Sequence, residues 1–213
     1  MSRRNVTAAF VISAVKPADF PRDGRPEIAL VGRSNVGKSS LINALVRQAV
    51  ARTSSTPGKT RQVNVYRITA GSGLPFYLMD LPGYGHAGGG DKARAEFQGL
   101  TSLYFGSRTG RDSRGRRPDG PRFPSALCGV VLAIDGRHPG LASDVEAWRW
   151  IASLGVPSLL VATKIDKLSQ AEKARLPKTC EAAFGHPPLA ASALAGDGLD
   201  QLWQDLHALS REP

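Results

Sequence analysis

The stretch EIALVGRSNVGKSSLINALVRQAV, residues 27–50, decides the fold class of this chain. Its first six residues form a short apolar run that ends in glycine, which predicts a buried strand. From Lys38 onward the apolar residues recur at spacings of three and four, which predicts an amphipathic helix. The loop between them, GRSNVGKS, fits the pattern G-x-x-x-x-G-K-[ST]. This pattern between a strand and a helix indicates a phosphate-binding loop.

Backbone N–H groups and the positive end of the helix dipole give such a loop its affinity for phosphate. Gly32 and Gly37 allow the backbone to turn and to approach a ligand closely. Lys38 is placed to reach the β- and γ-phosphate oxygens, and Ser39 to hold Mg²⁺. The alternative is an ordinary glycine-rich turn, which the full match in this context disfavours. The match comprises Gly32, Arg33, Ser34, Asn35, Val36, Gly37, Lys38 and Ser39.

A second motif, DLPG, ends another predicted strand and consists of Asp80, Leu81, Pro82 and Gly83. An acidic group at this position can hold Mg²⁺ through water, and the glycine amide can contact a γ-phosphate. The pattern D-x-x-G is weak alone, but it gains weight from its spacing after the phosphate-binding loop.

A third motif, TKID, bears on which nucleotide base is bound. It consists of Thr163, Lys164, Ile165 and Asp166. A carboxylate after an apolar strand can accept hydrogen bonds from both N1–H and the 2-amino group of guanine, and adenine lacks that pair of donors. The stem of Lys164 can pack over the base. Alone, this motif would be typical of a solvated charged turn; in series with the first two it indicates GTP. The small residues Ala191, Ser192 and Ala193 would let backbone amides reach the guanine O6 atom.

The loop TSSTPGKTRQ, residues 53–62, lies between the first two motifs and is expected to supply a threonine that closes on Mg²⁺ and the γ-phosphate. Thr53, Thr56 and Thr60 are candidates. We prefer Thr60, because it precedes the next strand and follows the flexible Pro57-Gly58 pair. A plain polar turn is the alternative.

Strand patterns alternate with helix patterns through most of the 213 residues, which predicts a three-layer α/β fold. The sheet is expected to be mostly parallel, with six or seven strands and helices on both faces. The length and a hydrophobic content of 41% favour a single domain, residues 1–213, that begins with a strand and connector over residues 1–26. The helix expected over residues 169–185 should be interrupted near Pro177.

The formal net charge is +10, and residues 28–75 carry seven Lys or Arg and no Asp or Glu. This excess fits a polyanion partner, either a nucleotide phosphate, RNA or both, and a basic solvated surface is the alternative. Residues 106–125 hold six arginines, four glycines and three prolines, which predicts an exposed insertion. No apolar run approaches the roughly 20 residues that span a bilayer, and the first residues make a poor signal peptide, so a cytoplasmic protein is expected.

The ordered motifs resemble those of the TrmE-Era-EngA-EngB GTPases, and within that group the match is to EngB (YihA/YsxC). The resemblance rests on GRSNVGKSSLINAL, TPGKT, DLPGYGHA, DGRHP and ATKIDKL, and it runs from about Phe10 to the C-terminus. It implies a Ras-like P-loop GTPase domain that binds GTP and GDP with Mg²⁺. It also implies a role in assembly of the bacterial large (50S) ribosomal subunit, on which normal cell division and septation depend. This chain departs from the family at residues 106–125, because other members usually run more directly from the preceding helix into the next strand.

The resemblance also assigns residues. Ser39 and Thr60 become the Mg²⁺ ligands. The nucleotide site gains Gly58, Lys59, Thr60, Arg61 and Gln62, together with Ala191, Ser192 and Ala193. The basic surface would contact ribosomal RNA, and a monomer is expected.

Catalysis is expected to be slow, because Tyr84 stands where Ras-type enzymes carry a water-orienting glutamine and a phenol is a poor base. The groups expected to act on the phosphates are Lys38, Thr60, Gly83 and Asn35. In related potassium-activated GTPases an asparagine at the position of Asn35 helps to hold K⁺. The alternative is that Asn35 stabilises the loop through a side chain–backbone hydrogen bond.

The main competing function is an ATP-using P-loop kinase or other phosphotransferase. The motifs TKID and DLPG, and the lack of an obvious lid or substrate domain, argue against it. The remaining motif, DGRHP (residues 135–139), is expected to be a structural turn at the end of a strand, with room for contact with a partner.

Overall fold

A computed structural model describes residues 6–51, 62–70, 73–84, 99, 101–108 and 127–211. Its strands form one seven-stranded sheet in the order β1-β3-β4-β2-β5-β6-β7. β1 and β4 pair antiparallel with β3, and the remaining neighbours pair parallel. The strands are β1 (Val6–Ala14), β2 (Glu27–Gly32), β3 (Val63–Ala70), β4 (Phe76–Asp80), β5 (Leu127–Asp135), β6 (Ser158–Thr163) and β7 (Leu189–Ala190).

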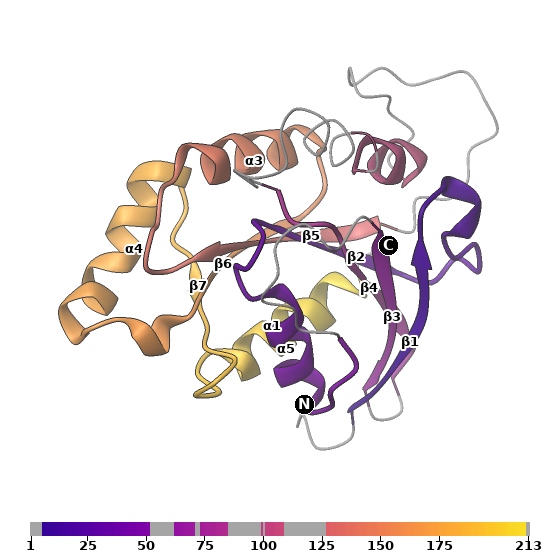
Figure 1. Cartoon of the computed structure of the whole chain (residues 1–213), viewed down its shortest axis with the longest axis horizontal. Helices are drawn as coiled ribbons and strands as arrows, with labels where there is room; N and C mark the ends of the chain where they lie inside the picture. The colour runs from indigo at the N-terminus through magenta and orange to yellow at the C-terminus, as the bar shows by residue number, and fades with distance from the viewer. Residues whose placement is uncertain are drawn as a thin grey trace.

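Helices cover both faces of the sheet (Figure 1). On one face lie α3 (Ala142–Ser153), α4 (Gln170–Phe184) and the helix that includes residues 101–108. On the other lie α1 (Lys38–Val46) and α5 (Leu199–Leu209). The prediction of a three-layer, mostly parallel α/β fold is therefore confirmed.

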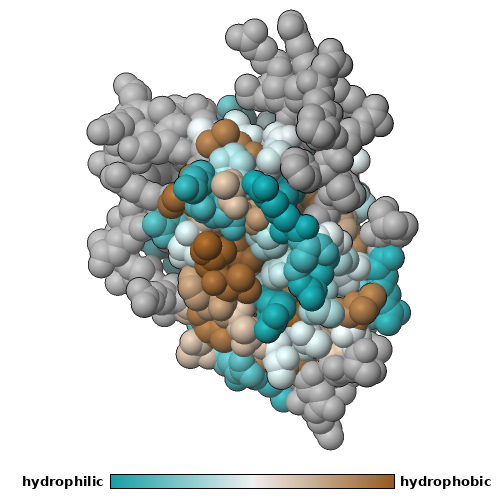
Figure 2. Space-filling model, turned by 90° about the vertical axis from the view of Figure 1, so that its right-hand side faces the viewer, coloured by the Kyte–Doolittle hydropathy of each residue, from teal (hydrophilic) through white to brown (hydrophobic). Residues whose placement is uncertain are grey.

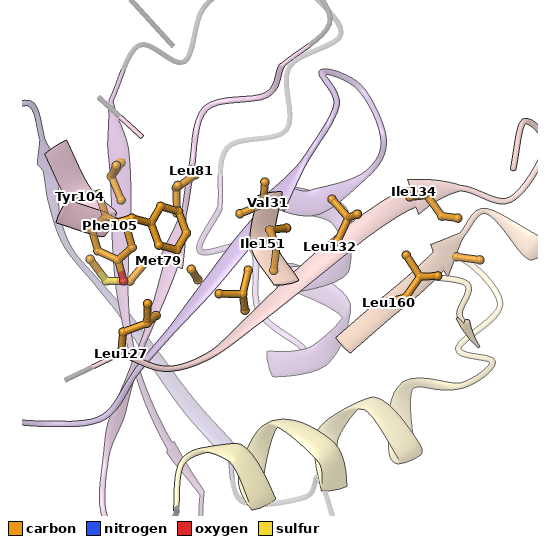
Figure 3. Close-up of a cluster of buried hydrophobic side chains, with 14 of the residues drawn as sticks. Val31, Met79, Leu81, Tyr104, Phe105, Leu127, Leu132, Ile134, Ile151 and Leu160 are labelled. Carbon is orange, nitrogen blue, oxygen red and sulfur yellow. The ribbon is translucent and has the colours of Figure 1, made fainter. Parts of the chain in front are cut away.

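Two hydrophobic clusters, one on each face of the sheet, hold the layers together. Figure 3 shows part of the cluster that faces α3, where Tyr104, Phe105 and Ile151 pack onto the central strands. The opposite cluster joins α1 and α5 to the sheet around Trp203. Because β2 and β4 are buried along their whole length, the loops at their carboxyl ends start from fixed positions.

The prediction that the helix over residues 169–185 is interrupted near Pro177 was wrong, because α4 runs through this residue. Pro177 lies on the exposed side of the helix, so water can satisfy the carbonyl group that loses its N–H partner. Leu176, Cys180 and Phe184 are buried along the opposite side. Their packing holds the helix continuous across the proline.

The expectation that Arg108 belongs to an exposed, basic insertion was also wrong. Residues 101–108 are helical, and only 9% of Arg108 is exposed. Its guanidinium group donates to both carboxylate oxygens of Glu27, at 2.9 and 2.7 Å. It also donates to the carbonyl oxygen of Pro21 at 2.7 Å. The other five arginines of the insertion lie outside the described residues.

Strand β1 forms one edge of the sheet and carries exposed hydrophobic side chains on Phe10, Val11 and Ile12, and Val15, directly after the strand, is exposed as well. Figure 2 views the molecule from the side on which β1 lies and shows a hydrophobic patch there. The pairing of β1 with β3 shifts between Phe10 and Ile12, which marks a bulge. A bulge of this kind disfavours addition of a further strand at an open edge.

Within the described ranges, no helix is long and apolar enough to cross a membrane.

Candidate nucleotide-binding site

The predicted phosphate-binding loop joins the end of β2 to the start of α1. Both glycines of the loop are required by the backbone geometry at their positions. A Cβ atom on Gly32 would lie 2.6 Å from the carbonyl oxygen of Ala133, and Gly37 has a φ of +107°, in the left-handed region. The backbone of the loop is thus fixed by the neighbouring strand β5 and by the first turn of α1.

Lys38 is buried at the centre of this loop, with 8% of its surface exposed. Its Nζ atom donates to the carbonyl oxygens of Gly32, at 3.1 Å, and Arg33, at 3.4 Å. Burial lowers the pKa of Lys38, and the nearby Asp80 carboxylate opposes this change. An anion bound in the loop would supply the further negative charge that a buried ammonium group favours.

Asp80 ends β4 next to the start of α1 and has the chemistry of a Mg²⁺ site. Its Oδ2 atom lies 3.5 Å from the hydroxyl of Ser39. Its Oδ1 atom is buried and has no hydrogen-bond partner among the described residues. Burial raises the pKa of Asp80 to about 6, against the opposing effects of Lys38 and Ser39. A hard cation with oxygen ligands would satisfy this pair of groups, so the residues present fit Mg²⁺.

The segment after Asp80 is fastened directly to the phosphate-binding loop. The backbone N–H of Ser34 donates to the carbonyl oxygen of Tyr84 at 2.9 Å, and its hydroxyl donates to that of Gly83 at 3.1 Å. A Cβ atom on Gly83 would lie 2.6 Å from the backbone of Ser34, so only glycine fits this approach. Movement of the DLPG segment must therefore break contacts with the loop.

Tyr84 is also held from the other side, by a residue that the sequence analysis did not single out. Its hydroxyl donates to Oδ1 of Asp144, in the first turn of α3, at 2.9 Å. Burial and the neighbouring Asp144 carboxylate both raise the pKa of Tyr84. Tyr84 is thus even less suited to act as a base than an ordinary phenol, in line with the prediction that it does not replace glutamine.

The TKID segment lies against the opposite side of the phosphate-binding loop. The Thr163 hydroxyl is 2.7 Å from the carbonyl oxygen of Val36, which ties the end of β6 to the loop. The Nζ atom of Lys164 donates to the carbonyl oxygen of Asn35 at 2.6 Å. The two motifs that are 127 residues apart in the sequence thus form one continuous surface.

Asp166 is held in place by the last of the predicted segments, residues 191–193. The Ser192 hydroxyl donates to Oδ1 of Asp166 at 2.6 Å, and the backbone N–H of Ala195 donates to the Ser192 oxygen at 3.0 Å. The backbone of Ala191 bonds to the end of β6 through the carbonyl oxygen of Ala162, at 2.8 Å. The structure therefore brings residues 191–193 beside the carboxylate that we expect to read the base.

The remaining predicted site residues differ in whether their side chains are buried or exposed. The side chains of Val36, Leu81 and Ile165 are buried in the hydrophobic clusters, so they anchor the loops rather than face a ligand. Asn35 is exposed, and its φ of +60° lies in the left-handed region that asparagine adopts more readily than most residues. Gln62 is exposed just before β3. Gly58, Lys59, Thr60 and Arg61, and the alternatives Thr53 and Thr56, lie outside the described residues.

Comparison with known proteins tests the motif-based interpretation. Residues 27–105 match the family described as "50S ribosome-binding GTPase". The probable GTP-binding protein EngB of Chlorobaculum tepidum is 41% identical over 199 residues, which cover 92% of this chain and 93% of the relative. This chain belongs to the EngB family. The EngB of Geobacillus kaustophilus is 38% identical over 204 residues, covering 93% and 94% of the two chains. As a member, the chain is a GTP-binding protein and a GTPase.

Solved structures confirm the fold of this EngB chain. A crystal structure of a probable EngB protein superposes with a TM-score of 0.63 at 22% identity, covering 88% of this chain and 100% of that one. Era in complex with MgGDPNP and nucleotides of 16S ribosomal RNA superposes with a TM-score of 0.68 at 24% identity, covering 88% of this chain and 57% of Era.

Proposed function

We propose that this EngB chain is a GTP-dependent switch with slow intrinsic hydrolysis that acts in assembly of the large ribosomal subunit. The observation that carries the choice of nucleotide is the placement of Asp166: Ser192 holds its carboxylate two residues after Lys164, which contacts the phosphate-binding loop. A carboxylate held there matches the two donors of guanine and repels the adenine edge, which offers an acceptor at N1.

The phosphates would be bound by the backbone of residues 32–39 and by Lys38. The carbonyl oxygens of Gly32 and Arg33 already draw Nζ of Lys38 into the loop. Bound Mg²⁺ would neutralise charge on the β- and γ-phosphates, and Ser39, Thr60 and, through water, Asp80 would hold it. The contacts of the described residues support these roles for Lys38, Ser39 and Asp80, whereas the role of Thr60 rests on its place in the sequence and on the family resemblance.

Switching would begin where Ser34 holds the DLPG segment. A contact between the amide of Gly83 and a γ-phosphate would shift the DLPG segment and strain the hydrogen bonds that Ser34 donates to Gly83 and Tyr84. The contact of Tyr84 with Asp144 would carry that movement to α3. Nucleotide state is thereby linked to the surface around the DLPG segment.

Competition between nucleotides tests the proposed base preference. A fluorescent GDP analogue bound to the wild-type chain should be displaced by GDP and GTP at concentrations at least about 100-fold lower than by ADP or ATP, because a hydrogen-bonding site rejects a ligand that lacks its donors by this factor or more. Preference for ATP would contradict the proposal and would favour the competing function, a P-loop kinase.

Asn35 supports a prediction about monovalent cations. Its backbone carbonyl is bonded to Lys164, whereas its exposed side chain makes no hydrogen bond with any described residue. If that side chain helps to hold K⁺ beside the phosphates, hydrolysis should be about tenfold faster or more in KCl than in NaCl. Single-turnover GTP hydrolysis in the two salts measures the ratio.

The matched variant for this test is Asn35→Gly, because glycine keeps the left-handed backbone while it removes the amide side chain. The ratio of rates in KCl and NaCl should fall to about one in this variant, with GDP affinity changed by less than about threefold. Equal rates in the two salts for the wild-type chain would rule out the K⁺ site and leave Asn35 a conformational role.

The ribosomal part of the proposal is supported by the family match, by the excess of basic residues in residues 28–75 and by the five arginines between residues 109 and 122. Deleting residues 109–122 should weaken association with large subunits and leave GDP affinity unchanged. The slope of log affinity against log salt should become shallower by about 0.7–0.9 for each RNA phosphate that the shortened chain can no longer bind.

The control for the deletion keeps the length of the segment and replaces only Arg111, Arg114, Arg116, Arg117 and Arg122 with glutamine. This variant should weaken association as much as the deletion does, because charge rather than chain length drives the binding. An unchanged salt slope in both variants would contradict a role for the segment in RNA binding.

A further inference from the structure

The DGRHP segment at the end of β5 places the ion pair of Asp135 and Arg137 beside the TKID segment. The backbone N–H of Arg137 donates to Oδ1 of Asp135 at 3.1 Å, and the backbone N–H of His138 donates to the carbonyl oxygen of Asp135 at 2.9 Å. The N–H of Gly136 donates to the carbonyl oxygen of Thr163 at 2.9 Å. The turn therefore fixes the Asp135 carboxylate against the TKID segment.

That carboxylate is shared by two cations. The Arg137 guanidinium binds it through both oxygens, with Nε 2.9 Å from Oδ1 and Nη2 2.6 Å from Oδ2. The Nζ atom of Lys164 donates to Oδ2 at 2.9 Å. Burial alone would raise the pKa of Asp135, but the hydrogen bonds from Arg137 and Lys164 hold it well below its usual range. Asp135 is therefore ionised wherever the protein is folded at neutral pH.

Lys164 in turn crosses the phosphate-binding loop. Its Nζ atom bridges the Asp135 carboxylate and the carbonyl oxygen of Asn35, at 2.9 and 2.6 Å. Its Cε atom lies 3.8 Å from the position that a Cβ atom of Gly37 would occupy. The backbone of Lys164 has a φ of +59°, which costs a residue other than glycine about 1–2 kcal/mol. The contacts of the Nζ atom compensate for this cost and hold the stem over the loop.

We propose that Asp135, held by Arg137, is a positioning residue for guanine-nucleotide binding. It fixes the side chain of Lys164 across the phosphate-binding loop, and the base packs on the stem of this lysine. Asp135 itself contacts no part of the nucleotide. This inference rests on the proposed guanine site and gives the DGRHP turn a function in that site. Its consequence is kinetic: without the anchor, the Lys164 stem leaves the loop more often and the nucleotide dissociates faster.

The test is a double-mutant cycle on the dissociation rate of fluorescent GDP, measured by stopped flow with the full chain. Asp135→Asn should raise the rate about tenfold, which corresponds to loss of one hydrogen bond between charged groups. In a Lys164→Met background the same substitution should change the rate by less than about twofold, because the group it acts through is gone.

The matched control is Asp23→Asn. Asp23 and Arg25 form another D-x-R ion pair, with a backbone bond from the N–H of Arg25 to Asp23 as well, in the loop before β2. The phosphate-binding loop follows the opposite end of this strand. This variant should leave the dissociation rate of GDP unchanged. If Asp135→Asn does not fold, Arg137→Gln serves instead, since the Arg137 side chain is 38% exposed and its loss frees the carboxylate to rotate.

Two results would overturn the inference. One is an unchanged rate in Asp135→Asn and Arg137→Gln while the wild-type chain and Asp23→Asn bind GDP. The other is an equal increase in the wild-type and Lys164→Met backgrounds, which would mean that Asp135 supports the fold and not Lys164. A wild-type chain that does not bind GDP would contradict the proposed function itself, and the inference would fail with it.

Discussion

Replacing Asp166 with asparagine should move the base preference of this GTPase from guanine toward xanthine. The carboxylate is held by Ser192 at 2.6 Å, so an amide in its place keeps the same position. Guanine presents donors at N1 and at its 2-amino group, and the amide nitrogen would face the second of these with another donor. Xanthine carries a carbonyl oxygen at that position, which the amide nitrogen can bind.

The affinity for GDP should fall by at least about 100-fold, or about 3 kcal/mol, because one charged hydrogen bond is lost and one donor is left unpaired. The affinity for XDP should rise over that of the wild-type chain. Competition of both nucleotides against a fluorescent analogue measures the two changes. Asp205→Asn, on the surface of α5, is the matched control and should leave both affinities unchanged. A variant of Asp166 that still prefers GDP would show that another group reads the base.

Replacing Arg108 with methionine should destabilise the fold by about 3–5 kcal/mol, because it leaves Glu27 as an uncompensated buried charge. Glu27 is 1% exposed and accepts from Arg108 and from the hydroxyl of Tyr104, at 3.0 Å. Urea unfolding measures the loss. Arg25→Met, which breaks the half-exposed pair with Asp23, should cost less than about 1 kcal/mol.

The pH dependence of the stability of Arg108→Met tests whether the unpaired Glu27 carboxylate causes the loss of stability. Burial raises the pKa of Glu27, and Arg108 opposes this rise, so removing Arg108 should raise the pKa further. A carboxyl whose pKa is higher in the folded state favours folding at low pH and costs stability as the pH rises through that pKa. The deficit of Arg108→Met should thus be smaller at pH 5 than at pH 7. A double variant with Glu27→Gln should recover much of it, whereas an equal deficit at both pH values and no recovery would contradict the account.

The phosphate-binding loop, DLPG and TKID could be placed from the sequence because each follows a strand whose apolar pattern is local and unambiguous. Their meeting also follows from parallel strands, whose carboxyl ends lie at one edge of the sheet. The contacts between them could not be predicted in this way. Asp144, which binds Tyr84, is 60 residues away from it in the sequence, and nothing around Asp144 distinguishes it from a surface residue of a helix.

The environment of Arg108 could not be predicted from the local sequence either. It stands in an arginine-rich stretch whose composition predicts exposure, yet it is helical, is 9% exposed and pairs with Glu27, 81 residues earlier. Composition averages over a segment, whereas burial is decided for each residue by the tertiary packing around it. Pro177 was misjudged for a related reason: the packing of three neighbours in α4 outweighs the local preference of one residue.

Sedimentation of the full chain with purified ribosomal subunits tests the proposed function most directly. Co-sedimentation with the large subunit should be strongest with a GTP analogue, weaker with GDP and reduced by added salt. Co-sedimentation that is absent in every nucleotide state, or equal for both subunits whatever the nucleotide, would contradict it.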